Sequence, residues 1–372
     1  MKIGITCYPT MGGSGIIATE LGINMAEKGH EVHFITSNTP FRIQMSHPNI
    51  TIHQVDVNQY SVFQYPPYDI TLATKIAEVI NSYDLDILHM HYAVPHAICG
   101  ILAKQISRSD VKIVTTLHGT DITVLGYDST LKEAIKFGIE DSDVVTSVSD
   151  SLKEQTYQII EPYKEIVTVY NFINEKDFKV GKNLELRRQY GIEDDEKVLM
   201  HVSNFRKVKR IEDVIKTFQL VRQVIKSKLV LVGDGPELNE MRCLAKKLGV
   251  EKDVLFLGKR SKIQTYYQMA DLFLLMSEKE SFGLVLLEAM YSGVPCIGTT
   301  AGGMKEVIKH QETGYIVEIG DYTSASQFAI QILTDEQLYK KMQAAMLMDI
   351  KQRFNSNQIS KQYENIYLEL IR

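Results

Sequence analysis

The stretch DLFLLMSEKESFGLVLLEAMYSGVPCIGTTAGG, residues 271–303, decides the fold class of this chain. It opens with an apolar run, Asp271–Met276, and a second short run follows at Pro295–Gly298. The segment between them holds the run LVLLEAM, residues 284–290, which favours a helix that begins near Gly283. An apolar strand, a helix and another apolar strand are typical of a parallel sheet with helices on both faces.

The same alternation extends over most of the chain and occurs twice. In the first half, β-branched runs alternate with amphipathic helical stretches such as Gly15–Lys28 and Tyr68–Tyr83. A polar segment, Val180–Lys197, then precedes a new series. Two Rossmann-like α/β units in series explain this doubling. The remaining expected strands are Lys2–Cys7, Glu31–Thr36, Asn49–Val55, Asp86–Met90, Val111–Leu117, Asp143–Val148, Val198–Ser203, Lys228–Gly233 and Val254–Gly258.

At 372 residues the chain is longer than one hydrophobic core usually organises. The segment VYNFINEKDF, residues 169–178, has the character of a crossing between two domains. We predict an N-terminal domain over residues 1–168 and a C-terminal domain over residues 169–355. The final helix, residues 356–372, is expected to pack back on the first domain.

Composition narrows the class of function. The net charge is −5, which argues against broad binding of nucleic acid or of anionic membranes, because both require basic faces. The start of the chain, MKIGITCYP, is typical of a buried strand rather than a signal peptide, and the four cysteines are far apart. We therefore expect a cytoplasmic protein with reduced cysteines and no zinc site. The sequence leaves open whether copies of the chain form a homo-oligomer.

A glycine cluster follows the first expected strand. It contains Gly12, Gly13, Ser14 and Gly15, and the string GSGIIA fits the pattern of dinucleotide-binding turns. A dehydrogenase would also need an acid at the end of the second strand, but that strand ends Ile35-Thr36-Ser37-Asn38. A tight turn that serves only packing and an anion site of another kind remain the two interpretations.

The quoted stretch carries two glutamates, Glu280 and Glu288, on either side of the expected helix start. Free N–H groups at a helix N-terminus suit a pyrophosphate, and carboxylates accept hydrogen bonds from the vicinal diols of a ribose or hexose. Taken alone, the pair is equally compatible with a surface glutamate and a glutamate that interacts with the helix dipole.

Other segments point to the same edge of the second sheet. The strand Val198–Ser203 leads into NFRKVKR, residues 204–210, and turns containing Gly235 and Lys259 end the next two strands. Ligands of open α/β sheets bind at the carboxyl edge of the strands, where these segments are expected to meet. A charge run of this kind is also often a solvated surface.

Together these segments resemble the family of retaining glycosyltransferases that includes sucrose synthases and mannosyltransferases, over nearly the whole chain. The hallmark is the pair of glutamates separated by seven residues within ESFGLVLLEAMYSGVPCIGTTAGG. The resemblance implies an α/β fold of the GT-B type, with two Rossmann-like domains whose parallel sheets face a central cleft. It implies a sugar-nucleotide donor in the C-terminal domain and an acceptor in the N-terminal domain, with no metal and no other cofactor.

The resemblance also implies roles by position. Arg206 and Lys209 neutralise the donor diphosphate, Glu288 holds the nucleotide ribose, and Glu280 faces the donor sugar together with the backbone that follows it. His118, at the end of a strand, is placed near that sugar. The implied catalytic residues are His118, Glu280, Arg206 and Lys209. The implied donor-binding residues are Gly12, Gly13, Gly15, Asn204, Arg206, Lys209, Gly235, Lys259, Glu280, Phe282, Gly283, Leu284 and Glu288.

One position departs from the family pattern. A glycine commonly follows the phosphate-binding lysine, and Arg210 stands there in this chain. The division of roles among Arg206, Lys207, Lys209 and Arg210 is therefore open.

The N-terminal half resembles one branch of the family in the strings CYPTMGGSG, HFITSNTPFR, VNQYSVFQYPPYD, HMHYAVPHA and TLHGTDITVLG. Members of that branch join N-acetylglucosamine from UDP-N-acetylglucosamine to L-malate, with retention, in the first step of bacillithiol biosynthesis. A dicarboxylate such as malate requires local positive charge, and an Arg–carboxylate pair suits it. The expected acceptor residues are Ser14, Arg42, Tyr92, Thr120 and Asn171.

Several alternatives stay open at this stage. The chain is compatible with a transferase for another small acceptor, with an epimerase or hydrolase of UDP-N-acetylglucosamine, and with a regulator that binds a nucleotide sugar without turnover. His89 and His91 alternate along one strand, but no third ligand is evident, so we expect no metal site there.

Overall fold

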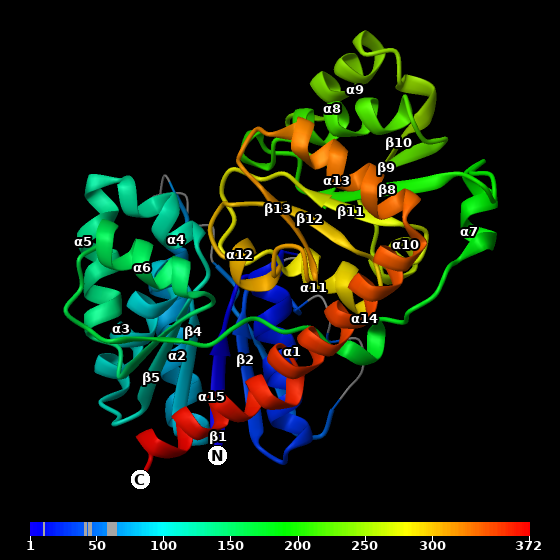
Figure 1. Ribbon diagram of the computed structural model, residues 1–372. Helices are drawn as coiled ribbons and strands as arrows, with labels where there is room; N and C mark the ends of the chain where they lie inside the picture. Colours follow the sequence, from blue (N-terminus) through cyan, green and yellow to red (C-terminus); the bar gives the residue numbers. More distant parts are fainter. Residues whose placement is uncertain (10–11, 41–42, 44–46, 58–64) are drawn as a thin grey trace. The chain divides into compact units, whose positions relative to one another are not determined.

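The computed structural model describes residues 1–9, 12–40, 43, 47–57 and 65–372 (Figure 1). The chain divides into two compact units. The first comprises Met1–Phe172 and Ser356–Arg372, and the second comprises Ile173–Asn355. The division after Phe172 lies inside the segment expected to cross between domains, rather than after Thr168.

The first unit is built on a parallel sheet with the strand order β3-β2-β1-β4-β5-β6-β7 in its described part. The order reverses between β1 and β4, because the chain extends the sheet to one side of β1 and then crosses to the other. The strands are β1 (Lys2–Thr6), β2 (Glu31–Thr36), β3 (Ile50–Gln54), β4 (Ile87–His91), β5 (Lys112–Leu117), β6 (Val144–Ser147) and β7 (Ile166–Thr168).

Helices cover both faces of this sheet. The α2 and α3 helices pack against Leu88 and Met90, and Gly22 of α1 lies against Ile5 and Phe34 on the opposite face. The helices and helical turns are α1 (Gly13–Glu27), α2 (Tyr68–Tyr83), η1 (Ala93–Ala97), α3 (Ile98–Ser107), α4 (Thr120–Thr123), η2 (Leu125–Tyr127), α5 (Ser129–Glu140), α6 (Asp150–Ile159) and α15 (Ser356–Leu370).

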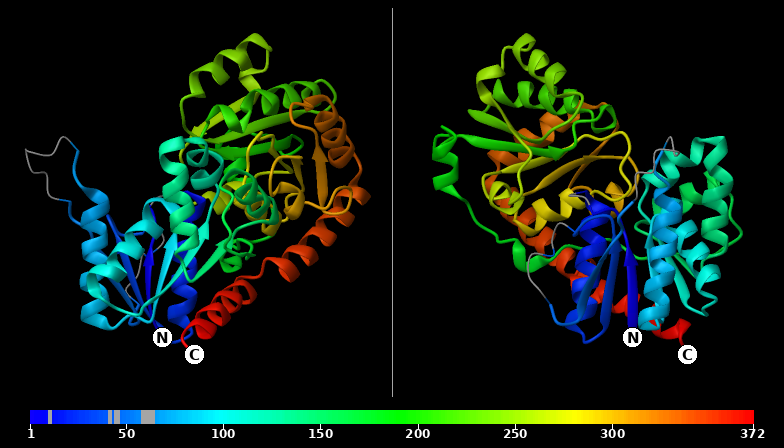
Figure 2. Two further views of the ribbon diagram at one scale, coloured as in Figure 1. Left: turned by 90° about the vertical axis from the view of Figure 1, so that its left-hand side faces the viewer. Right: turned by 180° about the vertical axis from the view of Figure 1, so that it is seen from behind.

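The C-terminal helix α15 belongs to this first unit and lies beside α1. It buries Tyr363 and Tyr367 completely, and the Tyr367 hydroxyl is 2.5 Å from Nδ1 of His89. Lys28 and His30 both pair with Glu364, at 2.7 and 2.9 Å. Figure 2 shows the two chain ends close together at the same end of this unit. The buried tyrosines account for the place of a segment that follows the whole second unit in sequence.

The second unit repeats the plan with the parallel strand order β10-β9-β8-β11-β12-β13 in its described part. The order again reverses between the first strand of the series, β8, and β11. The strands are β8 (Lys197–Ser203), β9 (Ser227–Gly233), β10 (Val254–Gly258), β11 (Leu272–Leu275), β12 (Cys296–Thr299) and β13 (Gly314–Val317).

The helices of the second unit lie on both faces of its sheet, with α8, α9 and α13 on one face and α11 and α12 on the other (Figure 1). The helices and helical turns are η3 (Glu175–Asp177), α7 (Leu184–Gln189), η4 (Lys207–Lys209), α8 (Ile211–Arg222), α9 (Leu238–Lys247), η5 (Glu251–Asp253), α10 (Ile263–Tyr267), α11 (Leu284–Tyr291), α12 (Met304–Val307), α13 (Tyr322–Thr334) and α14 (Glu336–Arg353).

The doubled α/β plan is confirmed, with two differences in detail. Sequence reasoning missed β7 and β13, which are short edge strands and therefore lack the long apolar run of a central strand. The α1 helix begins at Gly13 rather than Gly15, so Gly13, Ser14 and Gly15 form its first turn instead of a separate loop. Within the described residues, no helix has the length and apolar character needed to cross a membrane.

Candidate active site

In the second unit, two loops meet at the carboxyl ends of β8 and β11, where the strand order reverses. The backbone N–H of Glu278 donates to the carbonyl of Val208 at 2.9 Å, and Lys209 Nζ lies 2.7 Å from Glu280 Oε2. Both side chains of the ion pair are mostly buried, at 19% and 16% exposed. Ligands of open α/β sheets bind outside such a reversal. The structure therefore brings Lys209 and Glu280 together at the point where a ligand is expected.

Arg210 occupies a backbone conformation that explains the family preference for glycine. Its φ is +46°, in the left-handed region that favours glycine. Its guanidinium pairs with Asp213 at 2.6 Å and with Glu278 at 3.6 Å, and the hydrogen bond to Asp213 raises its pKa. The charge of Arg210 is thus already held by two carboxylates, whereas Arg206 and Lys207 are exposed in the same loop.

Glu288 lies inside α11, as predicted, and its surroundings are more closed than sequence suggests. The residue is only 4% exposed, and its Oε2 accepts a hydrogen bond from the Tyr267 hydroxyl at 2.8 Å. Burial, followed by the nearby Glu288 charge, raises the pKa of Tyr267 well above its usual value, so the phenol remains a donor. This contact holds the carboxylate in place, and it gives Glu288 a structural partner as well as a candidate ligand role.

Two glycines hold the loops at this edge of the second sheet close together. A Cβ at Gly235 would lie 2.1 Å from the carbonyl oxygen of Asn204, and one at Gly302 would lie 1.8 Å from that of Glu280. The N–H of Gly303 donates to the same Glu280 carbonyl at 3.1 Å. The Ala301-Gly302-Gly303 turn therefore fixes the backbone of Glu280.

Replacing Gly302 with Ala is expected to lower turnover by about a hundredfold, because a misplacement of about 1 Å at a reacting centre costs that much. The clash with the Glu280 carbonyl and the φ of +53° at this residue both force the loop to move. Steady-state kinetics and a melting curve check this. Gly249→Ala is the matched control, because its φ is +71° but no atom lies within 4 Å of the added Cβ. Equal losses in the two variants would assign the effect to backbone strain alone.

The remaining residues expected to bind the donor differ in which of their groups a ligand can reach. The side chain of Phe282 packs edge-on against Phe354 in the core, so only its backbone is available to a ligand. Gly283 is the N-cap of α11, Leu284 begins the helix, and Lys259 is exposed after β10. Ser277, at the end of β11, has a buried Oγ with no hydrogen-bond partner among the described residues. A buried hydroxyl without a partner is unusual, and here it lies at the ligand-binding edge.

In the first unit, three of the expected acceptor residues also meet where the strand order reverses, between β1 and β4. Gly12 caps α1, and the Tyr92 hydroxyl donates to Ser14 Oγ at 2.8 Å. Thr120, the first residue of α4, also hydrogen-bonds Tyr92. The first N–H groups of α1 have no partner within the helix and point to the same edge. Three of the predicted acceptor residues thus form one cluster at the helix N-terminus.

Tyr92 carries backbone strain that supports a functional reading. Its φ is +90° and its ψ is +138°, a combination that side-chain-bearing residues rarely adopt. Such strain costs about 1–3 kcal/mol and tends to persist at functional sites.

Asn171 and Arg42 were also expected to bind the acceptor. Asn171 is buried, and within the described residues no hydrogen bond joins it to Ser14 or Tyr92. Arg42 lies outside the described residues.

His118 is joined to a second histidine. Its Nε2 is 2.8 Å from Nδ1 of the fully buried His91, and the two rings stack at 5.1 Å between centroids. Desolvation lowers the pKa of His118 to about 3, so it is neutral at pH 7 and offers a hydrogen bond rather than a positive charge.

Family comparison covers both units of the chain. The model described as Glycosyl transferases group 1 matches residues 182–346, and the model described as Glycosyltransferase Family 4 matches residues 11–177. The N-acetyl-alpha-D-glucosaminyl L-malate synthase of Bacillus anthracis is 55% identical over 372 residues, which cover 100% of this chain and 98% of that protein.

The chain belongs to the family of glycosyltransferases.

Solved structures confirm the GT-B fold of this glycosyltransferase. HepE of Anabaena, in complex with UDP and glucose, has a TM-score of 0.82 at 22% identity, over 98% of this chain and 99% of HepE. Sucrose-phosphate synthase of Thermosynechococcus elongatus has a TM-score of 0.82 at 22% identity, over 99% and 98% of the two chains.

Sequence reasoning missed two residues that hold the His118 loop of the glycosyltransferase. Asp121 is fully buried and accepts hydrogen bonds from the N–H groups of Gly119 at 2.9 Å and Ala93 at 3.2 Å. Burial raises its pKa to about 6. His96, also fully buried, bonds through Nδ1 to the carbonyl of His91. The strings HGTD and HYAVPH contained these residues, but a polar residue next to a turn gives no signal of burial.

Buried polar atoms without partners mark the same edge of this unit. In the described part of the chain, Thr6 Oγ1, His91 Nε2 and His96 Nε2 lack hydrogen-bond partners. Thr6 ends β1 and His91 ends β4, the two strands at the reversal. The described residues contain no group of three or more His, Cys, Asp and Glu side chains that could hold a metal ion.

The buried histidines predict acid sensitivity. Burial lowers the pKa of His89 to about 3 and that of His96 to about 4, from 6.5 in the unfolded chain. Because these folded-state values are depressed, the unfolded chain takes up protons first, and stability is lost progressively as the pH falls from 6.5 to about 4 for His96 and to about 3 for His89. His96 alone accounts for about 3 kcal/mol over that window.

We expect the melting temperature to fall steadily between pH 6.5 and pH 4, and calorimetry at several pH values measures this. His89→Gln keeps a side chain that can bond Thr116 and Tyr367 but cannot titrate. That variant should show a shallower slope. A melting temperature that does not change over this window would contradict the assignment.

Proposed function

We propose that this glycosyltransferase transfers N-acetylglucosamine from UDP-N-acetylglucosamine to the hydroxyl of L-malate, with retention at the anomeric carbon, and releases UDP. This is the first step of bacillithiol biosynthesis. The observation that carries the proposal is the identity of 55%, over the full length, to the N-acetyl-alpha-D-glucosaminyl L-malate synthase of Bacillus anthracis. All four cysteines are free, and we place the reaction in the reducing cytoplasm.

The geometry of the second unit supports a donor diphosphate at the reversal of its strand order. Lys209 supplies a partly buried positive charge, exposed Arg206 stands in the same loop, and α11 begins at Leu284, four residues after Glu280. A helix N-terminus with nearby cations is a favourable anion site. HepE, which shares the fold, is named in complexes with UDP and with UDP-glucose.

Each bond change in the proposed reaction has an assigned group. The bond between the anomeric carbon and the β-phosphate oxygen breaks, and a bond to the malate hydroxyl oxygen forms on the same face of the sugar. The hydroxyl proton passes to the departing phosphate, which leaves as UDP. Negative charge grows on that phosphate, and prearranged cations and N–H dipoles stabilise such charge best. Lys209 and Arg206 of the second unit take this role.

The neutral His118 of the first unit and Glu280 of the second unit are each assigned to the donor sugar. A neutral imidazole both donates and accepts hydrogen bonds, and a carboxylate accepts from sugar hydroxyls. Contacts of this kind orient the anomeric carbon without placing a second carboxylate as a nucleophile.

The acceptor side is assigned to the cluster of Ser14, Tyr92 and Thr120, with Arg42 and Asn171 as further ligands of malate. Replacing Arg42 with Ala is expected to raise the malate requirement by one to two orders of magnitude, about 1.5–3 kcal/mol, while UDP affinity stays near normal. Arg42→Lys should recover only part of the loss, because an ammonium cannot make the forked contact. Malate kinetics of the variants measure this. Unchanged malate kinetics in Arg42→Ala would remove Arg42 from the site.

The test of the proposed function is a product assay with UDP-N-acetylglucosamine and a panel of small hydroxy acids, read by mass. We expect a malate glycoside and UDP release that depends on malate. UDP release without an acceptor would indicate a hydrolase or an epimerase. A glycoside of another acid would keep the transferase and change its acceptor, and binding without turnover would indicate a regulator.

A further inference from the structure

A pocket of about 560 Å³ lies in the second unit, away from the donor loops. It is formed at the amino-terminal ends of strands, by Lys197 at the start of β8, Asp271 just before β11 and Val294 just before β12. The donor residues follow the carboxyl ends of the same strands. Because β8 has seven residues, the two ends are roughly 20 Å apart. The pocket is therefore a separate site.

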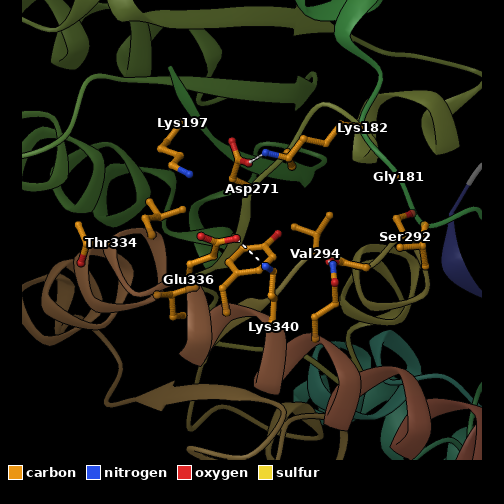
Figure 3. Close-up of a pocket in the computed structure, with 16 residues that line it drawn as sticks. Gly181, Lys182, Lys197, Asp271, Ser292, Val294, Thr334, Glu336 and Lys340 are labelled. Carbon is orange, nitrogen blue, oxygen red and sulfur yellow. Dashed lines mark hydrogen bonds and ion pairs between the residues drawn. The ribbon is translucent and has the colours of Figure 1, made fainter. Parts of the chain in front are cut away.

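Positive charge dominates the polar part of the pocket. Lys182, Lys197 and Lys340 line it, against the carboxylates of Asp271 and Glu336. Figure 3 shows Lys182 and Lys197 on either side of Asp271, with Glu336 and Lys340 nearby. This is an unusual balance in a chain whose net charge is −5.

The Asp271 carboxylate carries a single negative charge, and Arg187 and Lys182 share it. The carboxylate accepts from the fully buried Arg187 at 2.7 Å, from the backbone N–H of Val198 at 2.8 Å and from Lys182 at 2.6 Å. One of the two positive charges is therefore surplus.

The other pocket carboxylate is weakly held. Glu336 pairs with Lys340 at 2.6 Å, but both side chains are more than two-thirds exposed, and such pairs contribute little. Among the described residues, no ion pair involves Lys197 within 4 Å. Four cations, Arg187, Lys182, Lys197 and Lys340, thus face the two carboxylates of Asp271 and Glu336, and the pocket region keeps a net positive charge.

The rest of the wall is apolar. Val180, Ala270, Val294, Ile332 and Leu333 line the pocket together with Tyr339. Small-molecule sites typically occupy about 300–1,000 Å³ and combine an apolar wall with a few polar groups. The nearest helix N-terminus, that of α14, is not a competing anion site, because the Asp335 side chain accepts from its Gln337 and Leu338 N–H groups at 3.0 Å.

We infer that this pocket binds a small organic anion, a carboxylate or phosphate ester with an apolar body of about the size of a ring. The anionic group lies against Lys197 and Lys182, and the apolar body lies against the wall that includes Val294. A simple inorganic anion cannot contact the apolar wall, and a neutral aromatic compound cannot pair with the lysines.

The wall that contains Val294 also touches the helix that carries Glu288. Ser292 lines the pocket, and its Oγ donates to the Glu288 carbonyl at 2.9 Å. The Gln343 amide, from α14, donates to the Gly293 carbonyl at 2.6 Å. The bound anion therefore contacts the loop that ends α11, while remaining at the far end of the sheet from the diphosphate.

The probe for this site is phenyl phosphate, titrated by calorimetry into the full-length protein. The Lys209→Met variant serves as the background, since it lacks the main cation assigned to the donor loop. We expect phenyl phosphate to bind, and inorganic phosphate and benzyl alcohol to bind at least about tenfold more weakly, the equivalent of about 1.4 kcal/mol. This comparison does not depend on the identity of donor or acceptor.

Adding Lys197→Met should weaken phenyl phosphate by at least about tenfold, while Lys247→Met, at the exposed end of α9, should leave it unchanged. A melting curve shows that each variant is folded. Absence of phenyl phosphate binding would overturn the inference. So would equal affinity with and without Lys197, or an equal loss in Lys247→Met.

Discussion

Replacing Lys209 with Met is expected to lower turnover by about 10²–10³, the loss seen when one preorganised stabilising group is removed. The ammonium is mostly buried beside Glu280 at 2.7 Å, so its charge acts with little screening by solvent. Charge on the departing β-phosphate is larger in the transition state than in the bound donor, and turnover should therefore fall more than donor affinity. Steady-state kinetics with UDP-N-acetylglucosamine and malate measure both quantities.

Lys207→Met is the matched comparison for Lys209. It removes the same charge from the same short helical turn, but Lys207 is exposed. We expect a change of about threefold or less there, as for an exposed charge. Equal losses at both lysines would show that the net charge of the loop matters rather than the position of Lys209. An increase in the Michaelis constant alone would make Lys209 a binding group.

Arg206→Ala should lower turnover, as Lys209→Met does. Arg210 serves a different purpose, because Asp213 and Glu278 hold its guanidinium and it fills a left-handed position. The sequence showed four cations in this loop, but backbone conformation and pairing were needed to separate them.

The two sheets were predictable because their central strands are continuous apolar runs. Pairing across each sheet was harder to foresee. Lys209 and Glu280 are 71 residues apart in sequence, and they meet because β11 lies next to β8 in the sheet while β9 and β10 extend the other side. The general rule for open α/β sheets located the edge, and the strand order fixed the partners.

The N-terminal half shows where sequence reasoning stops. Ser14, Tyr92 and Thr120 were proposed from their places after strands, and they do form one cluster. Nothing in the sequence indicated that His96 and Asp121 are fully buried beneath it, because burial of a polar residue depends on partners supplied by other segments. The positive φ of Tyr92 was equally hidden, since tyrosine is not a residue that such a conformation favours.

Glu288→Gln is expected to weaken UDP binding by one to two orders of magnitude with little loss of stability. The carboxylate is assigned two hydrogen bonds to the ribose, and a bond to a charged acceptor is worth about 1.5–3 kcal/mol. The amide is isosteric and keeps an oxygen that can accept from Tyr267, but it loses the charge and replaces one acceptor oxygen with an NH2 donor. Glu288→Ala should cost more, because it removes both ribose contacts and also leaves the buried Tyr267 hydroxyl without this acceptor, at about 1–3 kcal/mol of stability.

Tyr267→Phe separates the ligand role of Glu288 from its structural role. That change removes the 2.8 Å contact but leaves the carboxylate in α11. If Glu288 binds ribose, Tyr267→Phe should keep UDP affinity within about threefold, since only a positioning contact is lost. Calorimetry with UDP and a melting curve for each variant distinguish the two roles. A loss in Tyr267→Phe as large as that in Glu288→Gln would make the pair a structural unit, and unchanged UDP affinity in Glu288→Gln would remove this glutamate from the donor site.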